Sequence, residues 1–404
     1  RAGTGGLRSW KMDTVIASGM NQAGAYFESK NHYQILDGLR GVASIMVVAF
    51  HVLEAFAGDD RFHQIINHGY LAVDFFFILS GFVVAYAYDD RWDKMTTWDF
   101  FKRRLIRLQP MVIMGSLVGA ALFYCQRSEM FPLIAGTPVW KMLLLMVVGF
   151  TLIPVTPAMD IRGWQEMHPL NGPAWSLFFE YIANILYALV IRRLTQLVLV
   201  VFVFLFAGLL VHYCVTGTQG DVIGGWTLNA PQLRIGFTRV LFPFFAGVLL
   251  CRAGKVIRVK GAFWICSLLL ITALSLPRFG GPGHLWINGL YESFCIIAIF
   301  PLIVAIGAGG VLTGKTATST CKFLGDISYP LYMTHYPLIY TYTAWVANHK
   351  VSLKSGWPVG LLLMVTSLIL AYACLKFYET PVRGWLTRRF QLNRRERRAP
   401  APDK

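Results

Sequence analysis

The stretch LDGLRGVASIMVVAFH, residues 36–51, has the apolar content of a membrane-spanning helix but also contains an aspartate, an arginine and a histidine. Ionisable side chains are costly in the hydrocarbon of a bilayer, and those that occur there usually serve a function. Arg40 and His51 would lie about 16 Å apart along a helix that rises about 1.5 Å per residue. Steps of about 100° per residue also bring both side chains to the same face. This face is therefore predicted to line a path through a helical bundle.

The composition of the whole chain agrees with a membrane protein. Of its 404 residues, 55% are hydrophobic and 14% are charged, whereas about a quarter of the residues in a typical soluble protein are charged. Many apolar segments approach the roughly 20 residues that a helix needs to cross the hydrocarbon core. These segments lie near 36–56, 69–88, 104–125, 139–155, 172–191, 195–214, 235–253, 261–277, 287–309, 325–346 and 356–378. The sequence therefore predicts an all-α, polytopic integral membrane protein.

The positions of the basic residues predict which segments cross the bilayer. Arginine and lysine gather in 91–107, at 192–193, in 252–260, at 315 and 322, and in the C-terminal tail. All of these clusters fall on one side if segment 139–155 re-enters the membrane or lies in its interface, and the positive-inside rule makes that side cytoplasmic. This interpretation gives ten transmembrane helices and places both termini in the cytoplasm. A genuine crossing by 139–155 is the alternative.

The net charge of +16 lies largely beside the apolar segments, a pattern that fits topology signals and anionic lipid heads better than nucleic acid. The seven cysteines have no metal-ligand spacing, so neither a metal site nor a disulfide framework is indicated. Residues 1–30 are expected to be an expression remnant or a disordered segment, 31–385 the membrane domain, and 386–404 a basic cytoplasmic tail. The oligomeric state is open, with a homo-oligomer as one alternative.

Two further segments carry carboxylates that this topology places at the depth of His51, in the outer half of the bilayer. Asp74 stands beside three phenylalanines and therefore needs a partner. His51 is one candidate, and a structural bond to a serine, an arginine or backbone amides is the alternative. Glu180 shares a polar stripe with Ser176 and Asn184, because the three are spaced four residues apart on a predicted helix. Such a stripe is expected to face a cavity or another helix.

Three later segments carry further polar side chains. Arg239 lies against the positive-inside trend and is expected to neutralise one of the two carboxylates. The segment ISYPLYMTHYPLIY, residues 327–340, aligns Ser328, Tyr332 and His335 on one face. His335 is either a second functional histidine or a partner in hydrogen bonding between helices. Glu292, a single polar residue near a helix end, is interpreted as structural.

Arginines gather at the opposite, cytoplasmic end of the predicted bundle. Arg103, Arg104 and Arg107 lie within one turn of each other at the start of their segment, and Arg40 joins them from the first helix. The guanidinium group is well suited to phosphate, so a phosphate-rich molecule is predicted to dock there. The alternative is that these arginines only anchor their helices at the inner interface.

The outer group has the composition of a general-base site. A carboxylate behind a histidine fixes the imidazole tautomer and supports the imidazolium formed during proton transfer. No cysteine or serine stands in a recognisable nucleophile motif, so direct attack by an acceptor hydroxyl is favoured over a covalent intermediate. The residues alone indicate a membrane enzyme or a proton-coupled transporter in which His51, Asp74 and Glu180 relay protons. The sequence contains no repeated halves of the usual transporter kind, which argues against the transporter.

The chain resembles the acyltransferase family 3 membrane proteins over about residues 36–385. Arg40 and His51 form the family's Arg-x10-His pair within the opening stretch. The remaining motifs follow in the family's order: GYLAVDFFFILSGF with Asp74, KRRLIRLQP with Arg104 and Arg107, NGPAWSLFFE with Ser176 and Glu180, then TRVLFPFFAG, GDISYPLYMTH and YETPVR. Each motif is weak singly, and together they are specific.

The resemblance implies a donor, an acceptor and a catalytic residue. The donor would be an acyl-CoA, usually acetyl-CoA, which enters from the cytoplasm as a co-substrate, with no permanently bound cofactor. The acceptor would be a sugar hydroxyl of a cell-surface polysaccharide or glycolipid, at the outer side of the bacterial inner membrane. The family pattern marks His51 as catalytic and Arg40 as its motif partner.

The mechanism expected from this resemblance assigns roles to named residues. His51, supported by Asp74 or Glu180, deprotonates the acceptor hydroxyl, which then attacks the thioester. Four arginines are expected to bind the phosphates of coenzyme A: Arg40, Arg103, Arg104 and Arg107. Five residues are expected to bind or position the acyl acceptor: Ser176, Asn184, Arg239, Tyr332 and His335.

Overall fold

The computed structural model of the protein describes residues 33–57, 60–62 and 64–396. Every regular element within these residues is a helix and none is a strand, so the predicted all-α class is confirmed. The expected N-terminal segment 1–30 lies outside the described residues. The expected tail 386–404 overlaps them only up to residue 396, where it forms the end of a helix.

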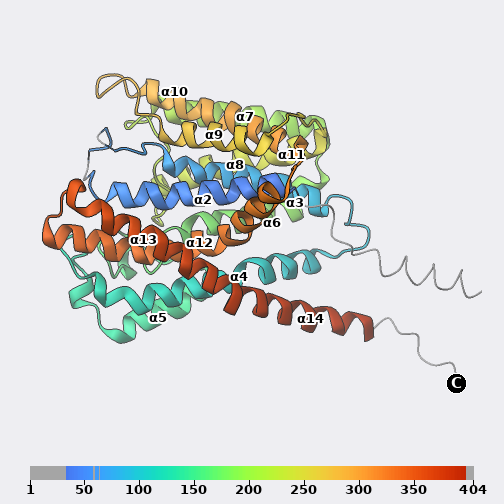
Figure 1. Ribbon diagram of the computed structural model, residues 1–404. Helices are drawn as coiled ribbons and strands as arrows, with labels where there is room; N and C mark the ends of the chain where they lie inside the picture. The colour runs from blue at the N-terminus through green and yellow to red at the C-terminus, as the bar shows by residue number, and fades with distance from the viewer. Residues whose placement is uncertain (1–32, 58–59, 63, 397–404) are drawn as a thin grey trace, which may run out of the picture. The chain divides into compact units, whose positions relative to one another are not determined.

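The helices follow one another along the chain (Figure 1). They are α2 (Gln34–Glu54), α3 (Ala72–Tyr88), α4 (Thr97–Leu122), α5 (Val139–Thr151), α6 (Ala174–Leu189), α7 (Gln196–Thr216), α8 (Ala230–Ala253), α9 (Ala262–Ser275), α10 (Trp286–Phe294), α11 (Phe300–Gly309), α12 (Lys315–His349), α13 (Leu353–Cys374) and α14 (Thr380–Glu396). The longest connection, residues 152–173, joins α5 to α6. A π-helical turn, Cys295–Ile299, joins α10 to α11, and another, Leu375–Glu379, joins α13 to α14. Such turns frequently occur at functional sites.

Eight helical stretches within the described residues are long and apolar enough to cross a bilayer. They are Gln34–Glu54, Gly69–Tyr88, Thr97–Gln126, Ala174–Arg193, Gln196–Thr216, Ala230–Ala253, Trp286–Gly309 and Leu353–Phe390. The 13 residues of α5 extend about 20 Å, less than the roughly 30 Å of the hydrocarbon core. The 14-residue α9 is also short. The 35-residue α12 is long enough to cross but is not among the eight stretches. The chain is thus a multi-pass membrane protein, while the count of ten and the cytoplasmic termini stay predictions.

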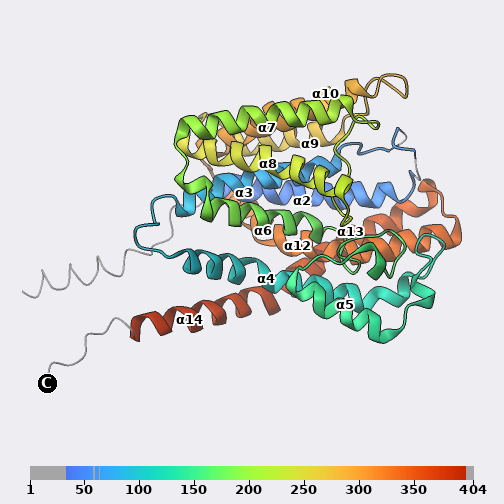
Figure 2. The same ribbon diagram turned by 180° about the vertical axis from the view of Figure 1, so that it is seen from behind.

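Helix α2 lies in the middle of the bundle in both ribbon views (Figure 1, Figure 2). It packs along α12 and also contacts α3, α9, α11 and α13. The approach to α12 is close because α2 has a glycine there: a β-carbon at Gly41 would lie 2.4 Å from the carbonyl oxygen of Leu324. Small residues of this kind let membrane helices pack backbone to backbone. We name the two ends of the bundle after the residues of α2 nearest to them, the Arg40 end and the His51 end.

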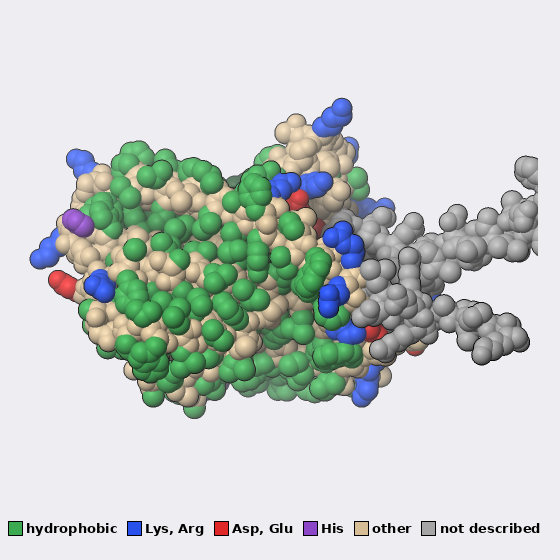
Figure 3. Space-filling model, turned by 90° about the horizontal axis from the view of Figure 1, so that it is seen from below, with side chains coloured by type: hydrophobic (Ala, Val, Ile, Leu, Met, Phe, Trp, Pro, Cys, Tyr) green, Lys and Arg blue, Asp and Glu red, His purple; other side chains and the backbone are tan. Residues whose placement is uncertain are grey.

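The surface has the pattern that a bilayer requires. Hydrophobic side chains cover the middle of the face shown in Figure 3, whereas charged side chains gather toward its two ends. Many large apolar residues are well exposed, among them Phe204 on α7 at 73% and Leu268 on α9 at 67%. Soluble proteins rarely expose so much contiguous apolar surface. This surface therefore faces lipid.

Candidate active site

His51, on the last turn of α2, has a carboxylate partner on its own helix. Its Nδ1 atom lies 2.6 Å from Oε2 of Glu54, three residues later. An ionised carboxylate only accepts hydrogen bonds, so Nδ1 carries the proton and Nε2 keeps a free lone pair. The His51 side chain is 17% exposed, which leaves the ring within reach of a substrate. A histidine held in one tautomer by a carboxylate is the arrangement of a general base.

His335 faces His51 from α12. The two ring centroids are 5.8 Å apart and the ring planes are inclined by 28°. Nδ1 of His335 donates to the backbone carbonyl oxygens of Leu331 and Tyr332, at 3.1 and 2.9 Å. Its Nε2 atom is buried and has no hydrogen-bond partner among the described residues. Both imidazoles therefore have an Nε2 lone pair available to a hydroxyl or thiol.

Tyr332 and Ser176, two predicted substrate-binding residues, contact each other next to the histidines. Their hydroxyl oxygens are 2.7 Å apart. Tyr332 precedes His335 by one helical turn, with ring centroids 5.9 Å apart. Tyr336 completes the group, because its ring packs edge-on against His51 at 4.7 Å. The structure thus brings together four residues that were selected from the sequence. They are His51 on α2, Ser176 on α6, and Tyr332 and His335 on α12.

Asp74 is not the partner of His51. Instead it forms an ion pair with Arg239 of α8, with Nη2 to Oδ2 at 2.6 Å and Nε to Oδ1 at 3.3 Å. Arg239 also donates to the carbonyl oxygen of Tyr70, at 2.7 Å, and both members of the pair are buried. The expectation that Arg239 neutralises one of the carboxylates is confirmed. The expected contact between Asp74 and His51 was wrong, because a buried carboxylate pairs more favourably with a permanent cation than with a neutral imidazole.

Glu180 is not the partner of His51 either. Its Oε1 atom accepts hydrogen bonds from Arg104 at 2.7 Å and from Ser80 at 2.8 Å. The side-chain amide of Asn184 donates to the backbone carbonyl of Glu180, at 2.9 Å. Glu180 therefore belongs with the arginines of the Arg40 end, and its expected position at the depth of His51 was wrong. The cause is that residues 166–177 are all buried, so α6 begins inside the protein and its residues lie deeper than a surface start would place them.

The arginines of the Arg40 end converge as the sequence predicted. Arg40 forms an ion pair with Asp37 at 3.1 Å and donates from Nε to the hydroxyl of Ser328 on α12, at 2.8 Å. Arg107 on α4 is within electrostatic reach of both Arg40 and Arg104. Arg103 lies one turn before Arg107 on the same helix and is half-buried. The group combines several guanidinium donors from α2 and α4, a composition suited to phosphate.

Two participants were missed in the sequence. Glu54 lies just beyond the opening stretch, and the signal that identifies it is the spacing of three residues from His51, which brings the two side chains to one face of a helix. The second is Arg383, in the YETPVR motif, which also reaches Arg107 electrostatically. Its signal is the four-residue spacing from Glu379, and the two side chains form an ion pair of 2.8 Å.

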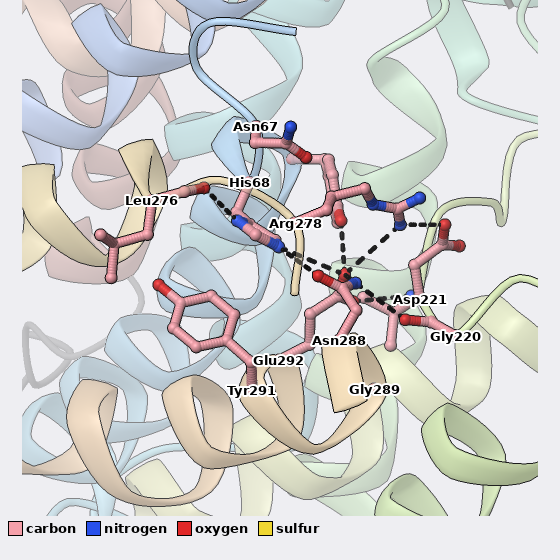
Figure 4. A network of polar contacts seen from close by, with 12 residues as sticks. Asn67, His68, Gly220, Asp221, Leu276, Arg278, Asn288, Gly289, Tyr291 and Glu292 are labelled. Atoms are coloured by element: carbon pink, nitrogen blue, oxygen red, sulfur yellow. Dashed lines mark hydrogen bonds and ion pairs between the residues drawn. The ribbon is translucent and has the colours of Figure 1, made fainter. Parts of the chain in front are cut away.

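A buried polar network closes the His51 end of the bundle (Figure 4). Its members come from the connections before α3, α8 and α10 and from α10 itself: His68, Tyr70, Asp221, Arg278, Asn288 and Glu292. Glu292 accepts from the hydroxyl of Tyr70 at 2.5 Å and from the amide of Asn288 at 2.8 Å, while Arg278 pairs with Asp221. This network joins three connections and continues through Tyr70 to Arg239. Glu292 is therefore structural, as the sequence indicated.

A groove of about 430 Å³ opens beside the end of α2. Apolar side chains such as Leu53, Phe56 and Val346 line it together with Lys350 and Ser352, so its surface is of mixed polarity. Leu53 and Ala55, on either side of Glu54 in the sequence, line the groove, whereas His51 and Glu54 themselves do not.

Comparison with known proteins finds several relatives, two of which are named as acyltransferases or acetyltransferases. The "O-acetyltransferase OatA" of Staphylococcus aureus (strain NCTC 8325 / PS 47) is 23% identical over 367 residues, which cover 86% of this chain and 57% of that protein. "Protein 2 in picA locus" of Rhizobium radiobacter is 34% identical over 165 residues, which cover 38% of this chain and 80% of that protein. "Acyltransferase MdmB" of Streptomyces mycarofaciens is 32% identical over 154 residues, 36% of each chain.

The chain spans little more than half the length of OatA. No solved structure matches it. Residues 33–376 match a family model described as an acyltransferase domain, and these residues contain every side chain of the site described above except Glu379 and Arg383. The chain therefore belongs to acyltransferase family 3 and carries the acyltransferase domain of that family.

Proposed function

We propose that the protein transfers an acetyl group from cytoplasmic acetyl-CoA to a sugar hydroxyl of a cell-surface polysaccharide or glycolipid, at the outer side of the bacterial inner membrane. The observation that carries this proposal is the placement of two groups at opposite ends of α2. His51, with Glu54 on Nδ1, stands at one end. Arg40, among other arginines, stands at the other. The name of the relative OatA, an O-acetyltransferase, supports acetyl as the group transferred.

The donor would bind at the Arg40 end, which corresponds to the cytoplasmic side of the predicted topology. Arg40, Arg104 and Arg107 supply guanidinium groups for the phosphates of coenzyme A. Glu180 and Ser80 orient Arg104, so Glu180 positions a donor-binding residue on this proposal. The pantetheine arm then runs along α2 toward His51, over the roughly 16 Å that separate the two residues along the helix.

The reaction uses His51 as a general base. Nε2 of His51 takes the proton of the acceptor hydroxyl while the hydroxyl oxygen attacks the thioester carbonyl carbon. A C–O bond forms, the C–S bond breaks, and the proton passes from the imidazolium to the departing thiolate of coenzyme A. Glu54 stabilises the imidazolium. One hydroxyl proton of the Tyr332–Ser176 pair lies between the two oxygens, so only the other can turn from the carbonyl oxygen of Pro173 to donate to the oxyanion.

The acceptor would approach from the His51 end. The lone pair on Nε2 of His335 can accept a hydrogen bond from a second sugar hydroxyl and hold the acceptor beside His51. The groove lined by Leu53 and Phe56 at this end of the bundle offers room for another part of the acceptor. On this proposal, Asp74 and Arg239 have a structural role and fix α3 to α8. The donors of Arg239 are directed to Asp74 and to Tyr70. Asn184 donates to the backbone of its own helix, so we do not place it in the acceptor site.

The test is acetyl transfer by protein reconstituted in lipid nanodiscs, with radiolabelled acetyl-CoA and a membrane glycolipid fraction. His51→Ala is expected to lower the rate of coenzyme A release and of acetyl transfer by about 10²- to 10⁴-fold, the usual contribution of a general base. The affinity for coenzyme A should change less than about twofold, since His51 is far from the phosphates. His349→Ala, at the exposed end of α12, is the matched control and should be fully active.

Full acetyl transfer by His51→Ala would exclude this histidine as the base. Proton uptake coupled to movement of sugar or acyl groups, with no release of coenzyme A by the wild-type protein, would instead indicate the proton-coupled transporter.

A further inference from the structure

We propose that the C-terminal helix α14 contributes Arg383 to a phosphate-binding site that it shares with Arg107 of α4, and that Glu379 holds Arg383 in place while the site is empty. The ligand chemistry is a phosphate ester or diphosphate, supplied either by a nucleotide such as coenzyme A or by an anionic lipid headgroup. The first of these ligands deepens the proposed function and rests on it, whereas phosphate binding itself does not.

The chain direction changes little at the junction that places Arg383. Leu375–Glu379 forms a π-helical turn between α13 and α14, and α14 contacts α4; both ribbon views show the start of α14 near α4 and the rest of the helix diverging from it (Figure 1, Figure 2). Residues on the first turn of α14 therefore face the arginines near the start of α4. Of the charged groups that act on Arg107, Arg383 has the largest effect, ahead of Arg40, Glu379 and Arg104.

The charges at this place do not balance. Three arginines have carboxylate partners: Arg40 with Asp37, Arg104 with Glu180, and Arg383 with Glu379. Among the described residues, Arg107 has no hydrogen bond or ion pair, although it is only half-exposed. Three arginines and one carboxylate, that of Glu379, act on Arg107, so the half-buried guanidinium has more like than opposite charge around it, which favours a bound anion. This imbalance is the first observation that points to a bound anion.

Glu379 provides the second observation. Its Oε1 atom accepts from Nη1 of Arg383 at 2.8 Å, but its Oε2 atom is buried and has no hydrogen-bond partner among the described residues. The Glu379 side chain is only 3% exposed, whereas that of Arg383 is 34% exposed. An ion pair with a purely structural role is expected to satisfy both carboxylate oxygens. Glu379 binds only Nη1 of Arg383, so the exposed edge of this guanidinium group stays free. A phosphate can bind two N–H groups there.

Tyr329 lies between the start of α14 and the arginines of the Arg40 end. Its hydroxyl donates to the carbonyl oxygen of Leu108, at 2.6 Å. The charges of Glu180, Glu379 and Arg107 all act on this hydroxyl. Tyr329 lies next to Ser328, which binds Arg40, and the π-helical turn that contains Glu379 contacts both α12 and α4. A phosphate between Arg107 and Arg383 would therefore adjoin Arg40 and Arg104.

The experiment is calorimetric titration of the full-length chain in nanodiscs made of neutral lipid, with three probes: coenzyme A, 3′-dephospho-coenzyme A and pantetheine. Arg383→Ala is expected to weaken coenzyme A binding about tenfold or more, in keeping with the loss of charge-assisted hydrogen bonds. Binding of pantetheine should not change. If the 3′-phosphate is the bound group, Arg383→Ala should not weaken binding of dephospho-coenzyme A further. Arg389→Ala, on the exposed part of the same helix, is the matched control and should stay within about twofold of wild type.

Glu379→Gln separates ligand binding from a structural role. Removing the competing carboxylate should tighten phosphate binding by a few fold, whereas a merely structural pair predicts no tightening. A parallel arm replaces part of the neutral lipid by phosphatidylglycerol and measures its retention by mass spectrometry. Lower retention in Arg383→Ala, with unchanged coenzyme A affinity, would identify the anion as a lipid headgroup.

Unchanged coenzyme A affinity and unchanged phosphatidylglycerol retention in Arg383→Ala would overturn the proposal. Failure of the wild-type protein to bind coenzyme A at all would count against the proposed function instead. In that case the lipid arm and a titration with inorganic pyrophosphate still test Arg383 on their own.

Discussion

Within one turn of α2, Glu54 decides which nitrogen of His51 is basic. The carboxylate accepts a hydrogen bond from Nδ1–H of His51, at 2.6 Å, and so leaves Nε2 as the base. A helix supplies this pair without help from the rest of the fold, because side chains three residues apart lie on one face. The geometry of the His51–Glu54 pair therefore depends on local sequence. Its use as a general base also depends on the neighbouring His335 and Tyr336.

Glu54→Gln is expected to lower the rate of acetyl transfer by about 10²-fold, within the usual range for disturbing a general base. A glutamine amide can donate to Nδ1 and favour the opposite tautomer, which removes the lone pair from Nε2. The measurement is the initial rate of coenzyme A release at saturating acetyl-CoA. Glu129→Gln, the same change in an exposed connection, is the control, and equal activity of both variants would rule out Glu54 as the partner.

The two nitrogens of His335 can be tested separately by amide substitutions. Asparagine can reproduce the Nδ1 donor that binds the backbone carbonyls of Leu331 and Tyr332, whereas glutamine places a polar atom near Nε2. If Nε2 binds the acceptor, His335→Asn should raise the KM for the glycolipid about tenfold, the cost of one lost hydrogen bond in a buried site. His335→Gln should retain more of the affinity. Identical KM values for the two variants would contradict a role for Nε2.

At the scale of elements, buried ion pairs join helices that are distant in the sequence. Asp74 and Arg239 join α3 to α8, and Glu180 and Arg104 join α6 to α4. Glycines allow the same helices to pack closely: a β-carbon at Gly81 of α3 would lie 2.1 Å from the carbonyl oxygen of Phe244 on α8. The ion pair of Asp74 therefore lies in an interface with little room for water or for rearrangement.

Asp74→Asn is expected to destabilise the protein by about 3 kcal/mol or more, because it leaves the buried guanidinium of Arg239 without a counter-charge. The measurement is the free energy of unfolding in mild detergent, followed by tryptophan fluorescence. The double variant Asp74→Leu/Arg239→Met should recover part of this loss, since it removes both charges together. Asp93→Asn, at an exposed position, is the control. A double variant less stable than Asp74→Asn would contradict this account of the pair.

At the scale of the whole molecule, the connection between α5 and α6 is fastened to α12 by a buried carboxyl group. The hydroxyl of Tyr340 donates to Glu166 at 2.5 Å, and Nε of Arg162 lies 3.7 Å from the same carboxyl oxygen. Burial raises the pKa of Glu166 to about 7, although the charge of Arg162 and the hydrogen bond from Tyr340 oppose the shift. Folding therefore favours the protonated form of Glu166.

The pH dependence of stability follows from this shift. An unfolded glutamate loses its proton near pH 4.5, so between about pH 4.5 and 7 the folded protein holds more protons than the unfolded chain. The stabilisation is complete below this window and is lost as the pH rises through it, by about 3 kcal/mol in total. Thermal unfolding in detergent between pH 5 and 8 should show this fall in the wild type and a flatter profile in Glu166→Gln. Parallel profiles would contradict the raised pKa.

Much of the fold and of the Arg40 end could be predicted from the sequence. Apolar runs define the membrane helices, because hydrocarbon excludes unpaired backbone groups whatever the tertiary packing. The helical period places Arg40 and His51 on one face, and it aligns Tyr332 with His335. The arginines of α2 and α4 were also grouped correctly, since both helices were placed with their first turns at the same side of the membrane.

The partners of the carboxylates could not be predicted in this way. A helical period gives the face of a residue but not its depth relative to a residue on another helix, and that depth depends on where each helix begins. The connection before α6 is buried from residue 166 onward, and this places Glu180 beside Arg104 rather than near His51. Asp74 likewise pairs with Arg239, a residue 165 positions away in the sequence, and not with His51. The sequence by itself determined the membrane helices and the local pair of His51 and Glu54, whereas only the tertiary structure decided the long-range ion pairs, because packing sets the depth and contacts of each helix.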